Sequence, residues 1–265
     1  MKTSRKYKIT LTTRSPLHVG GLDDPLGAED NPVALIGGQP CIPGPSLKGA
    51  LRAEIERYLI GRADGNAQLL PCLTTTEPSP GEKALAAGER KIYRPRPCSI
   101  VRDSNNENRG HQKKQEPICP ACYTLGAQGL VGFVSVPFLM AVGDLKPEAL
   151  YSSRIDRVTG TVASGNRSYQ VIKPGASFEG EMDVLLEDAI LGWSFGKKRP
   201  IRNREGEVLE VDQWLDHAAE LGQDQEGLLK SLVLERLEKI KLIGGYRSKG
   251  FGAVTIRVEK IRGGD

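Results

Sequence analysis

Apolar and polar positions alternate along some stretches of the chain and recur at helical spacing along others. Residues 6–14 alternate and are rich in β-branched side chains, which predicts a strand. Residues 46–60 carry leucine and isoleucine at positions four apart, which predicts a helix with Ser46 as its N-cap. The remaining predicted elements are strands within 130–142, over 178–186 and over 253–258, and helices over 211–221 and 226–241.

Two stretches stand apart from this pattern. Residues 61–120 are polar and proline-rich with little periodicity, and about sixty such residues in a compact domain suggest an insertion that needs an external staple. Residues 151–173 mix basic, small and β-branched side chains, which suggests a long basic hairpin. The order of elements predicts an α+β fold with a ferredoxin-like or RRM-like antiparallel sheet. We expect its core in 1–60 and 126–265 and the insertion in 61–125.

Composition narrows the class of partner. The net charge of +4 permits an anionic partner, while the aromatic content of 5% argues against recognition by base stacking. No apolar run approaches the length of a membrane helix, and the basic N-terminus lacks the apolar stretch of a signal peptide, so we expect a cytoplasmic protein without membrane contact. Five cysteines, an odd number, favour reduced thiols or metal ligands over a disulfide framework.

Three segments combine glycine with basic side chains, and they span 14–21, 42–52 and 244–252. In the second, a Pro/Gly loop leads into the helix whose first turns hold Ser46, Lys48 and Arg52. A helix N-terminus suits an anion, and the spacing is not that of a nucleotide-binding P-loop. In the third segment Arg247 and Lys249 supply the charge. Loops at matching strand ends of an α+β fold can converge. Together, these three segments would line a groove that holds a polyanion by its backbone and not by its bases.

The insertion contains a candidate metal site. Cys119 and Cys122 form a C-x-x-C pair, and His111 and Cys98 lie upstream. These residue types match a structural zinc site, whose binding energy would replace the missing core. Cys72 competes with Cys98 for the fourth position. A redox C-x-x-C needs a thioredoxin-like βαβ context, which the sequence does not offer.

Five motifs in order resemble the RAMP superfamily of CRISPR–Cas proteins, and most closely the backbone subunit of type III effector complexes, Cas family 7. They are Leu17-His18-Val19-Gly20-Gly21, Asp30-Asn31-Pro32-Val33, residues 42–52, residues 155–161 and residues 244–252. The resemblance implies that the polyanion is a CRISPR guide RNA (crRNA). It also implies partners, namely target RNA and other Cas subunits that include further backbone subunits. Residues 151–173 would be the "thumb" that kinks the guide–target duplex.

The resemblance also assigns residue roles. Asp30 would support cleavage of target RNA with magnesium or manganese, which makes the chain an endoribonuclease; by itself Asp30 is an ordinary turn former. The expected RNA-binding residues are His18, Gly20, Gly21, Ser46, Lys48, Arg52, Arg154, Arg157, Gly245, Arg247, Ser248 and Lys249. Two alternatives stay open within the superfamily: the same scaffold without cleavage, and a crRNA-processing endoribonuclease. A small-molecule phosphate-binding enzyme lacks its expected strand–glycine-loop signature.

Overall fold

The main sheet of the protein is antiparallel. A computed structural model describes residues 1–21, 31–100, 117–202 and 206–261, without the side chains of residues 154 and 163–167. The sheet has the order β12-β1-β8-β5-β3-β2, and β4 and β9 also pair with β8. The strands are β1 (Lys2–Thr13), β2 (Leu35–Ile36), β3 (Gln39–Ile42), β4 (Val134–Ser135), β5 (Leu139–Ala141), β8 (Ser177–Asp188), β9 (Trp193–Ser194) and β12 (Val254–Lys260).

The four strands β1, β5, β8 and β12 reproduce the predicted ferredoxin-like core. Helix α1 (Gly44–Arg62) lies between β1 and β5 in the chain, and α5 (Glu235–Lys239) lies between β8 and β12. This is the βαββαβ order, with β1 and β8 in the middle of the sheet. The α+β antiparallel fold predicted from the pattern is therefore confirmed.

Strand β1 shows how the alternating pattern builds the sheet. Tyr7, Ile9 and Leu11 are buried on the side that faces the helices. Lys8 and Thr10, which lie between them, are on the opposite face, and Lys8 Nζ lies 2.8 Å from Glu179 Oε2 on β8. One face is therefore apolar and the other charged, as the period of two requires.

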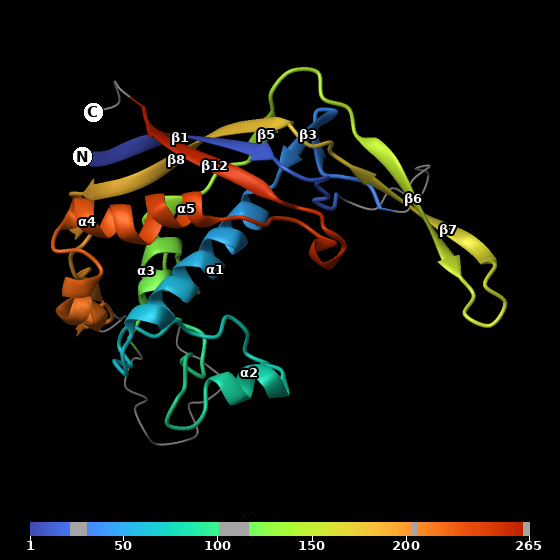
Figure 1. Ribbon diagram of the computed structural model, residues 1–265. Helices are drawn as coiled ribbons and strands as arrows, with labels where there is room; N and C mark the ends of the chain where they lie inside the picture. Colours follow the sequence, from blue (N-terminus) through green and yellow to red (C-terminus); the bar gives the residue numbers. More distant parts are fainter. Residues whose placement is uncertain (22–30, 101–116, 203–205, 262–265) are drawn as a thin grey trace.

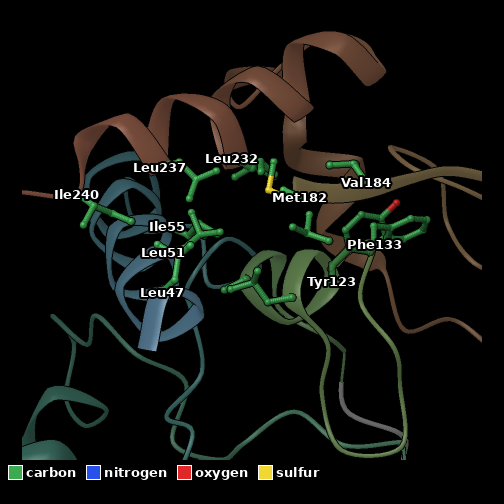
Figure 2. Close-up of a cluster of buried hydrophobic side chains, with 14 of the residues drawn as sticks. Leu47, Leu51, Ile55, Tyr123, Phe133, Met182, Val184, Leu232, Leu237 and Ile240 are labelled. Carbon is green, nitrogen blue, oxygen red and sulfur yellow. The ribbon is translucent and has the colours of Figure 1, made fainter. Parts of the chain in front are cut away.

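The helices cover one face of the sheet (Figure 1). Leu51 and Ile55 of α1 pack with Leu237 of α5 and with Met182 and Val184 of β8 in the core (Figure 2). Helix α3 (Pro120–Leu125) is buried along its whole length, and α4 (Gln225–Leu229) precedes α5 in the chain.

Helix α1 begins earlier than the sequence pattern indicates. It starts at Gly44 with Pro43 as N-cap and no side-chain capping bond, so the prediction of Ser46 as N-cap is wrong. Pro45 lies in the first turn, where its fixed φ suits a helix and its missing N–H costs nothing. Ser46 is therefore inside the helix, and its hydroxyl is not used for capping.

The C-terminal helical region is less regular than a single helix. The helix predicted over 211–221 is the 3-10 helix η2 (Gln213–Glu220). The predicted helix over 226–241 is α4, a π-helical turn η3 (Lys230–Leu234) and α5. Leu232 and Val233 of the π turn are both buried.

The predicted thumb is a separate two-stranded antiparallel sheet. It consists of β6 (Glu148–Ile155) and β7 (Val162–Val171) and projects away from the main sheet (Figure 1). At its tip, Asp156 Oδ1 accepts hydrogen bonds from the N–H groups of Val158 and Thr159, which lower the pKa of the Asp156 carboxyl. This local turn closes the hairpin.

The described part of the insertion is attached to the core by its own apolar residues. Leu69, Leu70 and Leu73 are buried, and α2 (Pro80–Leu85) carries a capping box between Ser79 and Glu82. Two short elements complete the described chain: the hairpin β10 (Ile201–Arg202) and β11 (Val208–Leu209), and the 3-10 turn η4 (Arg247–Lys249).

Candidate nucleic-acid interface and metal centre

The first and third glycine-rich segments meet. The N–H of Gly245 donates to the oxygen of His18 at 2.8 Å, and the N–H of Gly252 donates to Pro16 at 2.9 Å. Gly244 has a φ of +86°, and a Cβ there would lie 2.2 Å from the His18 oxygen. Only glycine allows this approach, so the sequence requirement at 244 is a backbone contact between two loops.

The same loops join the base of the thumb. The N–H of Leu17 donates to the backbone oxygen of Ile172 at 2.9 Å, and the N–H of Ile172 donates to the backbone oxygen of Leu17 at 2.8 Å. His18 Nδ1 donates to the Gln170 oxygen at 2.8 Å, and the His18 residue is only 6% exposed. The structure therefore places His18 inside this junction and not on its surface.

An aromatic cluster fills the junction. The Tyr246 ring stacks on Tyr169 with centroids 5.1 Å apart, and His18 lies 5.0 Å from Tyr246. Tyr246 has a φ of +54°, a left-handed conformation that costs a non-glycine residue free energy and persists only where the surroundings hold it. Lys249 Nζ lies 5.1 Å from the same ring. The η4 turn is thus held in place, and Arg247, Ser248 and Lys249 are all exposed on it.

The second segment is linked to the junction through the backbone. The N–H of Ala34 donates to the backbone oxygen of Val19 at 2.9 Å. The N–H of Cys41, which lies just before α1, donates to the backbone oxygen of Ala34 at 3.0 Å. At the start of α1, Lys48 is exposed and Ser46 is half-buried. Hydrogen bonds through Ala34 therefore join the first segment to Cys41, the residue that directly precedes the second segment.

The glycines of the first segment have different surroundings. Gly20 is exposed and pairs with Val33, while a Cβ on Gly21 would lie 2.7 Å from the Val33 oxygen. On the thumb, Arg157 is exposed. Asp30 and the side chain of Arg154 lie outside the described part of the chain.

Arg52 does not extend the exposed cationic surface. Its side chain is 17% exposed, and its Nε donates to Glu56 Oε1 at 2.7 Å. The Nη2 atom lies 3.4 Å from Cys72 Sγ, and Nη1 lies 3.5 Å from Cys122 Sγ. The structure thus turns Arg52 toward the cysteines of the insertion, whereas the sequence placed it with Ser46 and Lys48 among the residues expected to bind RNA.

Four cysteine sulfurs lie together beside Arg52. All are buried, their Sγ atoms lie within 4.8 Å of one another, and they belong to Cys72, Cys98, Cys119 and Cys122. A tetrahedral zinc with Zn–S bonds of about 2.3 Å separates its sulfurs by roughly 3.8 Å, so these four sulfurs fit a metal of this type. The Sγ atoms of Cys72 and Cys122 are 3.5 Å apart.

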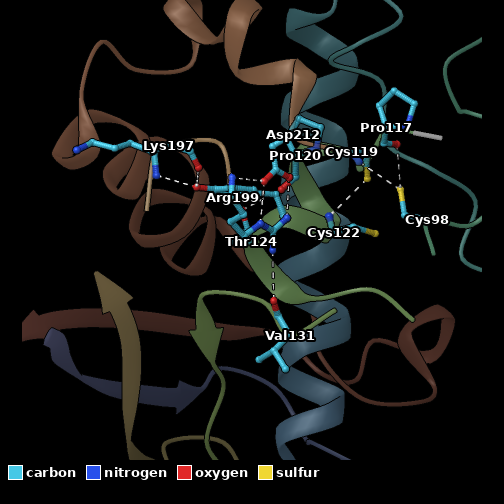
Figure 3. Close-up of polar contacts among 12 residues, drawn as sticks. Cys98, Pro117, Cys119, Pro120, Cys122, Thr124, Val131, Lys197, Arg199 and Asp212 are labelled. Atoms are coloured by element: carbon cyan, nitrogen blue, oxygen red, sulfur yellow. Dashed lines mark hydrogen bonds and ion pairs between the residues drawn. The ribbon is translucent and has the colours of Figure 1, made fainter. Parts of the chain in front are cut away.

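The local backbone prepares the sulfurs for a cation. Cys119 is the N-cap of α3, and its Sγ accepts from the Cys122 N–H at 3.5 Å (Figure 3). The Cys119 N–H in turn donates to Cys98 Sγ at 3.2 Å. N–H donors directed at sulfur stabilise thiolates, the form that binds metal.

Protonation within the cluster is uneven. Burial raises the pKa of Cys119, but hydrogen bonds from the neighbouring thiols and the charge of Arg52 outweigh burial and hold this pKa well below its usual range. The pKa of Cys98 is raised by hydrogen bonds with Cys119 and its neighbours. Thiols this close cannot all ionise unless a cation joins them.

The cluster resolves the choice between Cys72 and Cys98, because both belong to it. The sequence offered Cys72 only as an alternative to Cys98, whereas the fold brings both sulfurs to the C-x-x-C pair. His111 lies outside the described residues, and the four thiols already provide the number of ligands that a structural zinc uses.

The comparison with known protein families agrees with the resemblance. The model of the RAMP superfamily matches residues 10–136, which confirms the resemblance at the level of the superfamily. The matched segment contains the first two glycine-rich segments, α1 and all four clustered cysteines. No curated protein matches the chain. Among the described residues, no helix is long and apolar enough to cross a membrane.

Proposed function

We propose that the chain is a backbone subunit of a type III CRISPR–Cas effector complex that binds crRNA along its sugar–phosphate backbone. The observation that carries this proposal is the junction of residues 16–21 with 244–252 at the base of a projecting hairpin. Lys48, Arg247 and Lys249 are exposed on the connected segments and provide the charge for phosphates. Target RNA and other Cas subunits, including further backbone subunits, are the expected partners.

We further propose that the subunit cleaves complementary target RNA through Asp30. The described neighbour Asn31 supports this proposal, because the Asn31 oxygen accepts from the Gln170 N–H at 3.0 Å at the base of the hairpin. A bound magnesium or manganese ion would supply positive charge at the scissile phosphate, and Asp30 would help to hold it.

We also infer that the four-cysteine cluster binds structural zinc. The donor set supports this inference, since four sulfurs within 4.8 Å in a buried position match the coordination of zinc by cysteine. The metal would tie the insertion to the core by joining the segment after α1 to α3.

The effector complex reconstituted with a guide tests the cleavage proposal. Asp30→Ala should abolish cuts in complementary RNA while crRNA binding persists, and Glu187→Ala, which removes an exposed carboxylate on β8, should leave cleavage intact. A wild-type complex that binds guide and target without cutting favours the non-cleaving scaffold. Cleavage of repeat RNA by the isolated protein in chelator favours the processing endoribonuclease. Cleavage that survives Asp30→Ala contradicts the role of Asp30.

A further inference from the structure

The Arg52 guanidinium lies between the cysteine cluster and a carboxylate. One edge of its fork donates through Nε to Glu56, at 2.7 Å. The other edge reaches the sulfurs of Cys72 and Cys122 at 3.4 and 3.5 Å. Glu56 is itself fixed, since it accepts from the Tyr93 hydroxyl at 3.3 Å. Arg52 is therefore oriented from the side opposite the sulfurs.

We propose that Arg52 is a positioning residue of the four-cysteine metal site and not a contact to RNA. Four thiolates around one zinc leave about two excess negative charges in a buried place. A guanidinium that bridges two of the sulfurs offsets part of this charge and donates N–H bonds to the thiolates. The inference rests on the proposed metal site and not on the proposed cleavage.

The exposure and the partners of three cations on α1 support a role for Arg52 at the metal site and not in RNA binding. Lys48, one turn earlier, is exposed, and Arg57, one turn later, is 66% exposed in its side chain and pairs with Glu54. Arg52 alone of these three cations is turned inward, with its donors on Glu56 and the sulfurs. A lysine could not replace it fully, because only the planar fork serves a carboxylate and two sulfurs at once.

The position of Arg52 has a consequence for α1. Cys72 follows the loop after α1, and Cys122 lies in α3, so a residue of α1 that bonds both sulfurs fixes the helix relative to the metal. Lys48 extends from the same helix four residues before. Arg52 thereby supports the placement of the RNA-binding end of α1 without contacting RNA.

The test compares metal and RNA affinity in the full chain. Zinc affinity is measured by competition with a chromophoric chelator, and Co²⁺ substitution reports thiolate coordination through its charge-transfer absorption. We expect Arg52→Gln to lower zinc affinity by about 10- to 100-fold and to shift the cobalt spectrum. Crucially, its crRNA affinity at saturating zinc should stay near that of the wild type. Arg57→Gln is the matched control on the same helix and should change neither property.

Lys48→Gln should show the opposite result, with weaker crRNA binding and unchanged zinc affinity. If Arg52→Gln does not fold, Arg52→Lys decides, because it keeps the cation; we expect it to lose zinc affinity to a smaller extent. Unchanged zinc affinity in the Arg52 variants overturns the inference, as does a loss of crRNA binding at saturating zinc equal to that of Lys48→Gln. A wild-type protein that binds neither zinc nor cobalt removes the metal site itself and with it the inference.

Discussion

The Nδ1 atom of His18 donates a hydrogen bond to the backbone oxygen of Gln170 over 2.8 Å. The two residues are far apart in sequence, one in the loop after β1 and the other near the end of β7. The His18 backbone oxygen also accepts from Gly245. A single residue thus joins the first loop, the hairpin and the late glycine-rich loop, which explains why His18 is buried although Gly20, two residues further on, is exposed.

Replacing His18 should therefore loosen this junction. His18→Ala leaves the Gln170 oxygen without its donor and removes the ring packed on Tyr246, so we expect a loss of about 1–3 kcal/mol in the free energy of unfolding. Denaturant unfolding at equilibrium measures this loss. His217, which is exposed in η2, provides the control, and His217→Ala should shift stability by less than about 0.5 kcal/mol. Equal stability of the two variants would contradict the proposed support by His18.

RNA affinity should depend on salt through the exposed cations. Each lost phosphate contact reduces the slope of log affinity against log salt by about 0.7 for single-stranded nucleic acid. We expect Lys48→Ala and Arg247→Ala each to weaken crRNA binding and to reduce the slope by about this amount. Titration of labelled crRNA at several salt concentrations measures both quantities. Lys230→Ala, on η3, is the control and should leave the slope unchanged; a reduced slope there would show that the charge effect is not local.

Metal content should follow the four clustered cysteines. Elemental analysis should give about one zinc per chain, and Cys72→Ser and Cys98→Ser should each lower it, because both sulfurs belong to the tetrahedral set. Cys41→Ser is the matched control, since Cys41 is also a buried thiol but lies outside the cluster. Removal of zinc by chelator should lower the melting temperature of the wild type.

His111→Ala completes this experiment. We expect the variant to keep its zinc, because the four sulfurs already supply the full number of ligands. A loss of zinc in His111→Ala together with full zinc in Cys72→Ser or Cys98→Ser would restore the histidine to the ligand set and remove one cysteine from it.

The sequence pattern predicted the helices and strands that bury only one face against the rest of the protein. β1 alternates because one face meets the helices and the other meets water, and α1 shows leucine at positions four apart because it packs on the sheet. The hairpin was predicted because residues 151–173 mix basic side chains with small and β-branched ones, and β6 pairs with β7 there. Each of these features depends on residues that are close together in the sequence, so the local pattern is enough to predict it.

The candidate site was less predictable, because it depends on contacts between distant segments. Arg52 and Lys48 share one helix face, and the pattern could not indicate that a loop of the insertion covers only Arg52. The sequence left open whether Cys72 or Cys98 is the fourth metal ligand, whereas the fold brings both sulfurs close to the cysteines at the start of α3. Pro45 lies in the first turn of α1. A proline there is compatible with more than one N-cap position, so the sequence did not decide that the helix starts at Gly44.

Two adjacent ion pairs offer a final prediction about stability. The side chains of Arg199 and Asp212 are fully buried, and Arg199 Nη2 lies 2.7 Å from Asp212 Oδ1 (Figure 3). The guanidinium lies 4.6 Å from the centre of the Tyr123 ring. Asp212→Ala strands the buried cation, so we expect a loss of about 3–5 kcal/mol in the free energy of unfolding. Lys198 and Asp216 lie nearby but are exposed, at 46% and 59%.

Asp216→Ala should therefore change stability little, because water replaces the lost partner of an exposed lysine. Denaturant unfolding of the two aspartate variants gives the comparison. A double variant, Arg199→Met with Asp212→Leu, should recover part of the loss, since it removes the stranded charge and keeps apolar volume beside Tyr123. If Asp212→Ala costs no more than Asp216→Ala, the buried pair does not hold this part of the core together.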